Sequence, residues 1–174
     1  MFSFIKSLFT PDDCKKKGLA LLEARQYEEA AEQFRAALER SPGDGGLLLN
    51  ISHALFEQKK FDEAVPYLKT ASEKASSINP VPAIMLGYAL YKSEKLEEAG
   101  QALSAALKID SKHPAAHYYM GLLNLKLGNI DAATDSFEEV ISEKPTFIQA
   151  RLLAIGEMFI INSEQKTKKA NTDN

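Results

Sequence analysis

The sequence predicts an all-α solenoid, in which pairs of antiparallel helices stack along the chain. The first observation is an internal repeat: the tetrapeptides YEEA, FDEA, LEEA and IDAA are spaced by 34, 35 and 34 residues and begin at Tyr27, Phe61, Leu96 and Ile130. The second observation is that proline or glycine interrupts the helical pattern at regular intervals, while no strand-like alternation is visible. A fixed period in this range is typical of stacked supersecondary units.

Residue size repeats in the same register as the tetrapeptides. A small residue precedes each of them and a large residue follows, at Gly18, Ser52, Gly87 and Gly121 and at Phe34, Leu68, Leu103 and Phe137. Small residues recur where two helices must approach closely, and large ones recur where they must fill space. A single globular core has no reason to impose this register four times.

On this pattern the chain resembles the tetratricopeptide repeat family, whose unit is a 34-residue helix–turn–helix. The resemblance implies four units, at residues 11–44, 45–79, 80–113 and 114–148. The small eighth, small twentieth and large twenty-fourth positions of the family recur in all four units, the twentieth as Ala30, Ala64, Ala99 and Ala133. The closing proline is matched only at Pro42 and Pro145, and the bulky fourth position is never tryptophan.

The two ends of the chain differ from the repeats. Residues 1–10, called the arm here, form an expected amphipathic helix with large apolar side chains at Phe2, Phe4, Ile5, Leu8 and Phe9. Residues 149–162 match the first helix of a fifth unit and are expected to cap the array. Residues 163–174 contain almost nothing to bury, so we expect them to be disordered.

The capping helix is apolar nearly all round, which predicts that something covers it. A second copy of the protein, a partner or the arm are the three candidates, with Phe159, Ile160 and Ile161 as the residues for self-association. The arm itself could also lie in a groove of the array or exchange between copies.

Composition excludes several classes of protein. The chain has 21 basic and 24 acidic residues, whereas a nucleic-acid-binding protein usually has a basic surplus. Cys14 is the only cysteine, which excludes an intramolecular disulfide and a cysteine-rich zinc site. No run approaches the roughly 18 apolar residues of a membrane span, and Lys6 interrupts the arm, which is a poor match to a secretory signal. We expect a cytoplasmic protein; weak attachment of the arm to a membrane surface stays open.

The pattern predicts no enzyme, metal site or cofactor. Paired acids such as Glu28 and Glu29 fall in the first turn of each second helix, where negative charge complements the helix dipole. His113 and His117 are four residues apart, a spacing that can place two metal ligands on one helical face. However, Pro114 begins that helix, and His117 occupies the bulky packing position of the unit.

The family resemblance implies that the first helices of the units line a concave groove. The expected groove residues are mostly large and apolar or aromatic: Leu19, Leu22, Leu49, Asn50, His53, Phe56, Ile84, Tyr88, Tyr91, Lys92, Tyr118, Leu122, Leu125 and Lys126. Contiguous exposed apolar surface of this kind usually marks a binding site. A register shifted by one residue would instead place some of these side chains in the core.

We therefore predict a non-enzymatic adaptor or assembly scaffold that holds an apolar or amphipathic segment of a protein or peptide partner in this groove. The alternative is a chaperone for a secreted or membrane-inserting client, which the size, acidity and groove polarity of the chain also fit. A grip on acidic chaperone tails is not expected, because Leu19, Val81 and Met85 occupy three positions of the carboxylate clamp found in one branch of the family.

Overall fold

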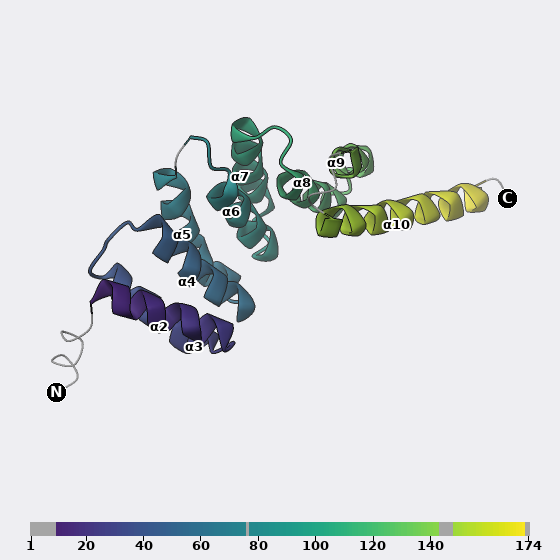
Figure 1. The fold of residues 1–174 in the computed structure, drawn as a ribbon. Helices are drawn as coiled ribbons and strands as arrows, with labels where there is room; N and C mark the ends of the chain where they lie inside the picture. Colours follow the sequence, from purple (N-terminus) through teal and green to yellow (C-terminus); the bar gives the residue numbers. More distant parts are fainter. Residues whose placement is uncertain (1–9, 76, 143–147, 173–174) are drawn as a thin grey trace.

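The computed structural model describes residues 10–75, 77–142 and 148–172, and within these ranges every regular element is an α-helix, which confirms the predicted all-α class (Figure 1). The helices form four consecutive pairs and one final long helix. They are α2 (Pro11–Glu23) with α3 (Tyr27–Leu38), α4 (Gly45–Glu57) with α5 (Phe61–Lys74), α6 (Val81–Lys92) with α7 (Leu96–Ile109), α8 (Pro114–Lys126) with α9 (Ile130–Ser142), and α10 (Ile148–Thr172). The arm lies outside the described residues, apart from Thr10.

Side-chain caps begin the first helices of the first two pairs. Thr10 caps α2 through a reciprocal pair of hydrogen bonds, in which the Asp13 amide donates to Thr10 Oγ1 (3.1 Å) and the Thr10 amide donates to Asp13 Oδ2 (2.9 Å). Asp44 caps α4 by accepting from the amides of Gly46 (2.8 Å) and Leu47 (3.1 Å). These caps define where the units start.

The turn inside each pair has the same geometry in all four units. One residue adopts positive φ, at Arg25 (58°), Lys59 (59°), Glu94 (62°) and Gly128 (79°). The next residue donates a backbone hydrogen bond to the carbonyl five residues earlier, as from Gln26 to Leu21 (2.8 Å) and from Asn129 to Asn124 (2.9 Å). This Schellman arrangement satisfies carbonyls at the end of the first helix and reverses the chain.

In three of the four pairs, a glycine of the first helix lies directly against a large residue of the second. A Cβ atom added to Gly18 would lie 2.6 Å from Phe34 Cε1, and one added to Gly87 would lie 2.6 Å from Leu103 Cγ. The large residues Phe34, Leu68, Leu103 and Phe137 are all fully buried. The small residue therefore lets the two helices approach closely enough to enclose the large one.

Successive pairs stack mainly through contacts of each second helix with the next first helix, and toward the end of the array first helices also contact one another. Each helix contacts the next along the chain, and α8 also contacts both α6 and α10, which hold the first-helix position in the neighbouring pairs. The stack in Figure 1 accordingly runs as one curved array from α2 to α10. Each first helix contacts second helices on part of its surface only. The rest of its surface is not covered by them.

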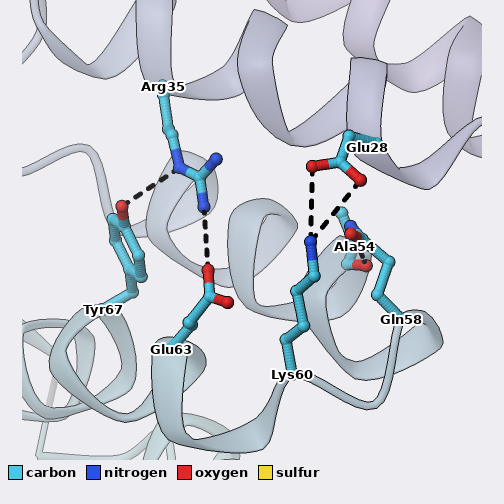
Figure 2. A network of polar contacts seen from close by, with 7 residues as sticks. All are labelled: Glu28, Arg35, Ala54, Gln58, Lys60, Glu63 and Tyr67. Atoms are coloured by element: carbon cyan, nitrogen blue, oxygen red, sulfur yellow. Dashed lines mark hydrogen bonds and ion pairs between the residues drawn. The ribbon is translucent and has the colours of Figure 1, made fainter.

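Ion pairs link the second helices of neighbouring units in a repeated register. Lys60, just before α5, contacts Glu28 in the first turn of α3 (3.3 Å), and Lys95, just before α7, contacts Asp62 in the first turn of α5 (2.9 Å). Figure 2 shows the first of these pairs beside Arg35. The corresponding residue before α9 is Asn129, so the series of lysines ends there.

The expected disorder of residues 163–174 is wrong for most of that segment, because α10 continues to Thr172. The segment contains no glycine or proline that would end the helix. A helix that is already nucleated adds a backbone hydrogen bond with each further residue, and this does not require burial of side chains.

Replacing Gly121 by alanine should lower the free energy of unfolding by about 1–3 kcal/mol, because the new methyl group would overlap the buried Phe137 ring. The matched control is Gly156→Ala in α10, where none of the described residues comes within 4 Å of the added carbon. That control should be neutral or stabilise the protein by up to about 1 kcal/mol. Urea unfolding followed by circular dichroism measures both, and equal losses in the two variants would contradict the packing argument.

The pKa of the Asp62 carboxyl should rise toward its ordinary value in the Lys95→Met variant, because the hydrogen bond from Lys95 is the main cause that lowers this pKa. Since the pKa is depressed in the folded state, the stabilisation by the pair is present above the unfolded-state pKa and is lost as the pH falls through the folded-state pKa. Carboxyl-carbon NMR titration measures the change. Lys69→Met, on the same helix two turns away, should leave the Asp62 midpoint in place.

Candidate functional site

The candidate site is the side of the first helices that is turned away from the second helices, called the first-helix face here. Leu19 is 42% exposed, and His53, Lys92 and Lys126 are also exposed. The other predicted groove residues, apart from Ile84, are half-buried: Leu22, Leu49, Asn50, Phe56, Tyr88, Tyr91, Tyr118, Leu122 and Leu125. Val81, at the start of α6, adds a further aliphatic side chain that is 42% exposed.

The assignment of Ile84 to the groove is wrong. Its side chain is only 5% exposed and packs in a core cluster with Ala83, Ala106 and Ala116. Alanine at these neighbouring positions leaves a space between α6, α7 and α8 that a branched side chain fills. Ile84 therefore stabilises the stack rather than lining its surface.

Aromatic rings connect the middle of the first-helix face from α4 to α8. Phe56 packs against Phe61 and Tyr88, with ring centroids 5.5 Å and 5.6 Å apart, and Tyr88 stacks on Tyr119 at 4.7 Å. Tyr118 continues the series at 5.5 Å from Tyr119. Because the rings pack against one another, little side-chain entropy remains to be lost when a partner contacts them.

Two members of this aromatic series, Phe61 and Tyr119, were not predicted from the sequence. Phe61 is the first residue of a second helix, and Tyr119 lies beside Tyr118 on α8. The signal available in the sequence was that each lies close to a predicted aromatic groove residue along the chain, Phe61 five residues after Phe56 and Tyr119 next to Tyr118.

Burial favours the neutral form of three tyrosine hydroxyls on this face. Burial raises the pKa of Tyr88 and of Tyr119, and it raises the pKa of Tyr118 with a further contribution from the charge of Glu157 on α10. A neutral phenol both donates and accepts a hydrogen bond. These three side chains combine an apolar ring with a polar group that can orient a ligand.

The charges at the ends of the first helices differ between the two halves of the face. Glu23 and Glu57 lie at the ends of α2 and α4, while Lys92 and Lys126 lie at the ends of α6 and α8. His53 lies 3.8 Å from Glu57. Lys126 pairs with Glu94 and lies 5.2 Å from the centre of the Tyr91 ring, and Lys92 lies 5.6 Å from the centre of the Phe61 ring. The first helices thus end on acidic residues in the first half of the face and on basic residues in its second half.

A separate hollow of about 870 Å³ lies between α3 and α5, away from the predicted groove. The Arg35 guanidinium group lines this hollow and has two polar partners. Arg35 Nε donates to Tyr67 Oη (3.2 Å), and Arg35 Nη2 lies 3.8 Å from Glu63 Oε2 (Figure 2). The apolar part of its lining is formed by Leu38, Pro42, Leu48 and Pro66. The sequence signal for this hollow was Pro66 inside a helix, next to Tyr67.

On α10, the three predicted self-association residues divide between surface and core. Phe159 is 75% exposed and Ile160 is 51% exposed. Ile161 is wrongly predicted as a surface residue, because it is 5% exposed and packs with Val140 and Ala154. The helical period places Ile161 on the side of α10 that contacts α9.

The two histidines considered for metal binding have different positions. His113 is the residue before α8, and His117 lies inside that helix with Nε2 2.9 Å from the Ser111 carbonyl oxygen. Among the described residues, no group of three or more histidine, cysteine, aspartate or glutamate side chains could hold a metal ion. Within the same part of the chain, no helix has the length and apolar character required to cross a bilayer.

Solved structures with the same architecture share less than a quarter of their residues with this chain. The crystal structure of the protein MamA superposes with a TM-score of 0.73 at 22% identity, over 92% of this chain and 94% of that one. The structure of YrrB, described as "a TPR protein with an unusual peptide-binding site", superposes with a TM-score of 0.68 at 24% identity, over 76% of this chain and 68% of that one. These likenesses establish the fold.

Curated relatives are longer proteins that carry repeats of the same kind. The TPR repeat-containing protein MJ1428 of Methanocaldococcus jannaschii is 30% identical over 139 residues, which is 78% of this chain and 24% of that protein. Tetratricopeptide repeat protein 21A of Mus musculus is 29% identical over 102 residues, which is 55% of this chain and 8% of that protein. The chain thus spans about a quarter or less of the length of these relatives.

Family models match nearly all of the paired helices. Models described as "Tetratricopeptide repeat" match residues 21–77 and 115–146, and one described as "TPR repeat" matches residues 87–128. The matched stretches contain the small-against-large contacts at Gly87 and Gly121 and the Schellman turns described above. The chain belongs to the tetratricopeptide repeat family.

Proposed function

We propose that this protein is a non-enzymatic adaptor or assembly scaffold that binds an apolar or amphipathic helical segment of a partner protein along its first-helix face. The observation that carries the proposal is the continuous series of half-buried aromatic and leucine side chains on this face, bordered by the exposed Leu19 and Val81. Its family membership supports a role as a protein-interaction scaffold.

The apolar part of the face would supply most of the binding free energy. Rings such as those of Tyr88 and Tyr91 are already held in place by their neighbours, and rigid aromatic residues are frequent hot spots at protein interfaces. Burying a large apolar side chain fully contributes about 1.5–3 kcal/mol. A partner that covers Leu19 and the aromatic series would therefore need only a few apolar anchors for specific binding.

The charge distribution would determine the direction in which the partner lies. Lys92 has a ring contact with Phe61 and, among the described residues, no ion pair with an acidic side chain, so it is available to an acidic group of a ligand. Glu23 and Glu57 would favour a basic group at the opposite end. We infer an amphipathic segment with acidic residues toward α6 and α8 and basic residues toward α2 and α4.

The Leu19→Asp and Lys92→Glu variants test this function with helical peptides selected by phage display against the full chain. Leu19→Asp should weaken binding of a selected peptide about tenfold or more, since it replaces an apolar contact by a charge. Lys92→Glu should weaken peptides with an acidic end more than the same peptides with that end neutralised. Isothermal titration calorimetry measures both effects.

Ile109→Asp is the matched control, because Ile109 is a 37% exposed aliphatic residue at the end of a second helix. This variant should bind the selected peptides like the unaltered chain. Failure to select any helical peptide, or equal losses in Leu19→Asp and Ile109→Asp, would contradict binding on the first-helix face.

The chaperone alternative makes a different demand on the same face. A chaperone would keep an aggregation-prone apolar client soluble during co-expression, whereas an adaptor would bind a partner that is already folded. The pre-packed aromatic series favours the adaptor, because a surface that adapts to many unfolded clients is usually built from flexible side chains.

A further inference from the structure

The last helix repeats the first half of a unit, including the glycine that receives a large side chain. Gly156 of α10 follows Gly121 by 35 residues, in register with Gly87 and Gly18. At the three earlier glycines an added Cβ atom would collide with a side chain of the following second helix. At Gly156 no atom of the described residues lies within 4 Å of such a Cβ atom. The slot that a second helix fills in these units is therefore open here.

Large apolar side chains surround this open slot. Phe159 and Ile155 lie one turn or less from Gly156 and are 75% and 45% exposed, and Ile160 and Leu153 lie along one flank at 51% and 52%. The buried residues of α10, Ala154 and Ile161, point toward α9 and the core instead. We call the surface formed by residues 153, 155, 156, 159 and 160 the slot face.

We propose that the slot face binds the slot face of a second copy, as an antiparallel helix pair about a two-fold axis. In such a pair every contact occurs twice: if one residue contacts a second residue of the partner, that second residue contacts the first residue of the partner. Phe159 and Gly156 are three residues apart on one side of the helix. A two-fold axis that passes midway between them therefore places Phe159 of each copy over Gly156 of the other. Leu153 then lies near the partner's Ile160.

Self-complementarity is what favours a second copy over another occupant. The slot face carries both halves of the contact that joins the helices of each unit, a large side chain and a glycine that leaves room for it, as with Phe34 and Gly18. An unrelated helix would need to supply a large residue at the slot and also accommodate Phe159. A second copy meets both requirements with the same two residues.

The expected dimer is weak and depends on concentration. Interfaces of standard size bury about 800 Å² on each partner, and one face of a few helical turns provides less than this. Four exposed large apolar side chains nevertheless form a contiguous patch of the kind that marks an interaction surface. We expect a dissociation constant in the micromolar range. This dimer leaves the first-helix face out of the contact, so the test is independent of the proposed function.

Sedimentation equilibrium of the full chain, at concentrations up to about 1 mM, tests the dimer. The unaltered chain should change from monomer to dimer over this range, whereas Phe159→Glu and Gly156→Gln should remain monomeric. Gly156→Gln is informative because it fills the slot with an uncharged side chain that favours a helix, so its melting temperature should not fall. The matched control is Ile78→Glu, which changes an 83% exposed aliphatic residue elsewhere and should leave the dissociation constant unchanged.

Disulfide trapping tests the register and the occupant. In a Cys14→Ala background, a mixture of Phe159→Cys and Gly156→Cys chains should form the mixed disulfide at least several times faster than either chain forms its own. A monomer at all concentrations, or association that Phe159→Glu does not weaken, would overturn the dimer. Disulfides within each single variant that form as fast as the mixed one would overturn the antiparallel register.

Discussion

The rest of the structure depends on one contact, in which a large side chain of a second helix packs against a small residue of the first helix. Glycine in the middle of a helix costs about 0.5–1 kcal/mol relative to alanine. The chain accepts this cost at Gly18, Gly87 and Gly121 because each glycine permits complete burial of a residue such as Phe34. Full burial of a phenylalanine contributes about 1.5–3 kcal/mol, which exceeds the cost. The contact thereby fixes how closely the helices of a unit approach.

The candidate site follows from this packing. Each second helix covers one side of its first helix, and the first helices from α4 to α10 contact one another, α4 and α6 through the rings of Phe56 and Tyr88, so their remaining sides form a shared surface. Residues on that surface cannot be fully buried, yet those that are large enough, such as Phe56, Tyr88 and Tyr119, reach across unit boundaries and pack together. The same aromatic side chains therefore stabilise the stack and present a partly exposed apolar surface.

The repeat made the fold predictable, because small and large residues recur at fixed positions. Errors arose where burial depends on neighbouring units rather than on position within one unit. Ile84 is in the core because alanines of α7 and α8 leave space beside it, and Phe61 joins the first-helix face although it begins a second helix. The absence of apolar residues beyond residue 163 does not predict the helix there, because backbone hydrogen bonding alone extends a helix that is already formed. The hollow beside Arg35 was missed because it lies on the second helices, which the family resemblance did not assign to binding.

The end of the described array presents a physical problem that the interior does not, because no described helix follows α10 to cover it. A polar outer face is the usual solution. Here α10 keeps the residue types of an interior first helix, with glycine at position 156 and large apolar residues on both sides of it. In an isolated chain this composition leaves Phe159 and Ile160 exposed to water. The exposed apolar residues form a contiguous patch, whereas single scattered apolar residues are common on protein surfaces. The same small-against-large contact that builds each unit is therefore incomplete at α10, and its completion requires a helix that the described residues do not supply.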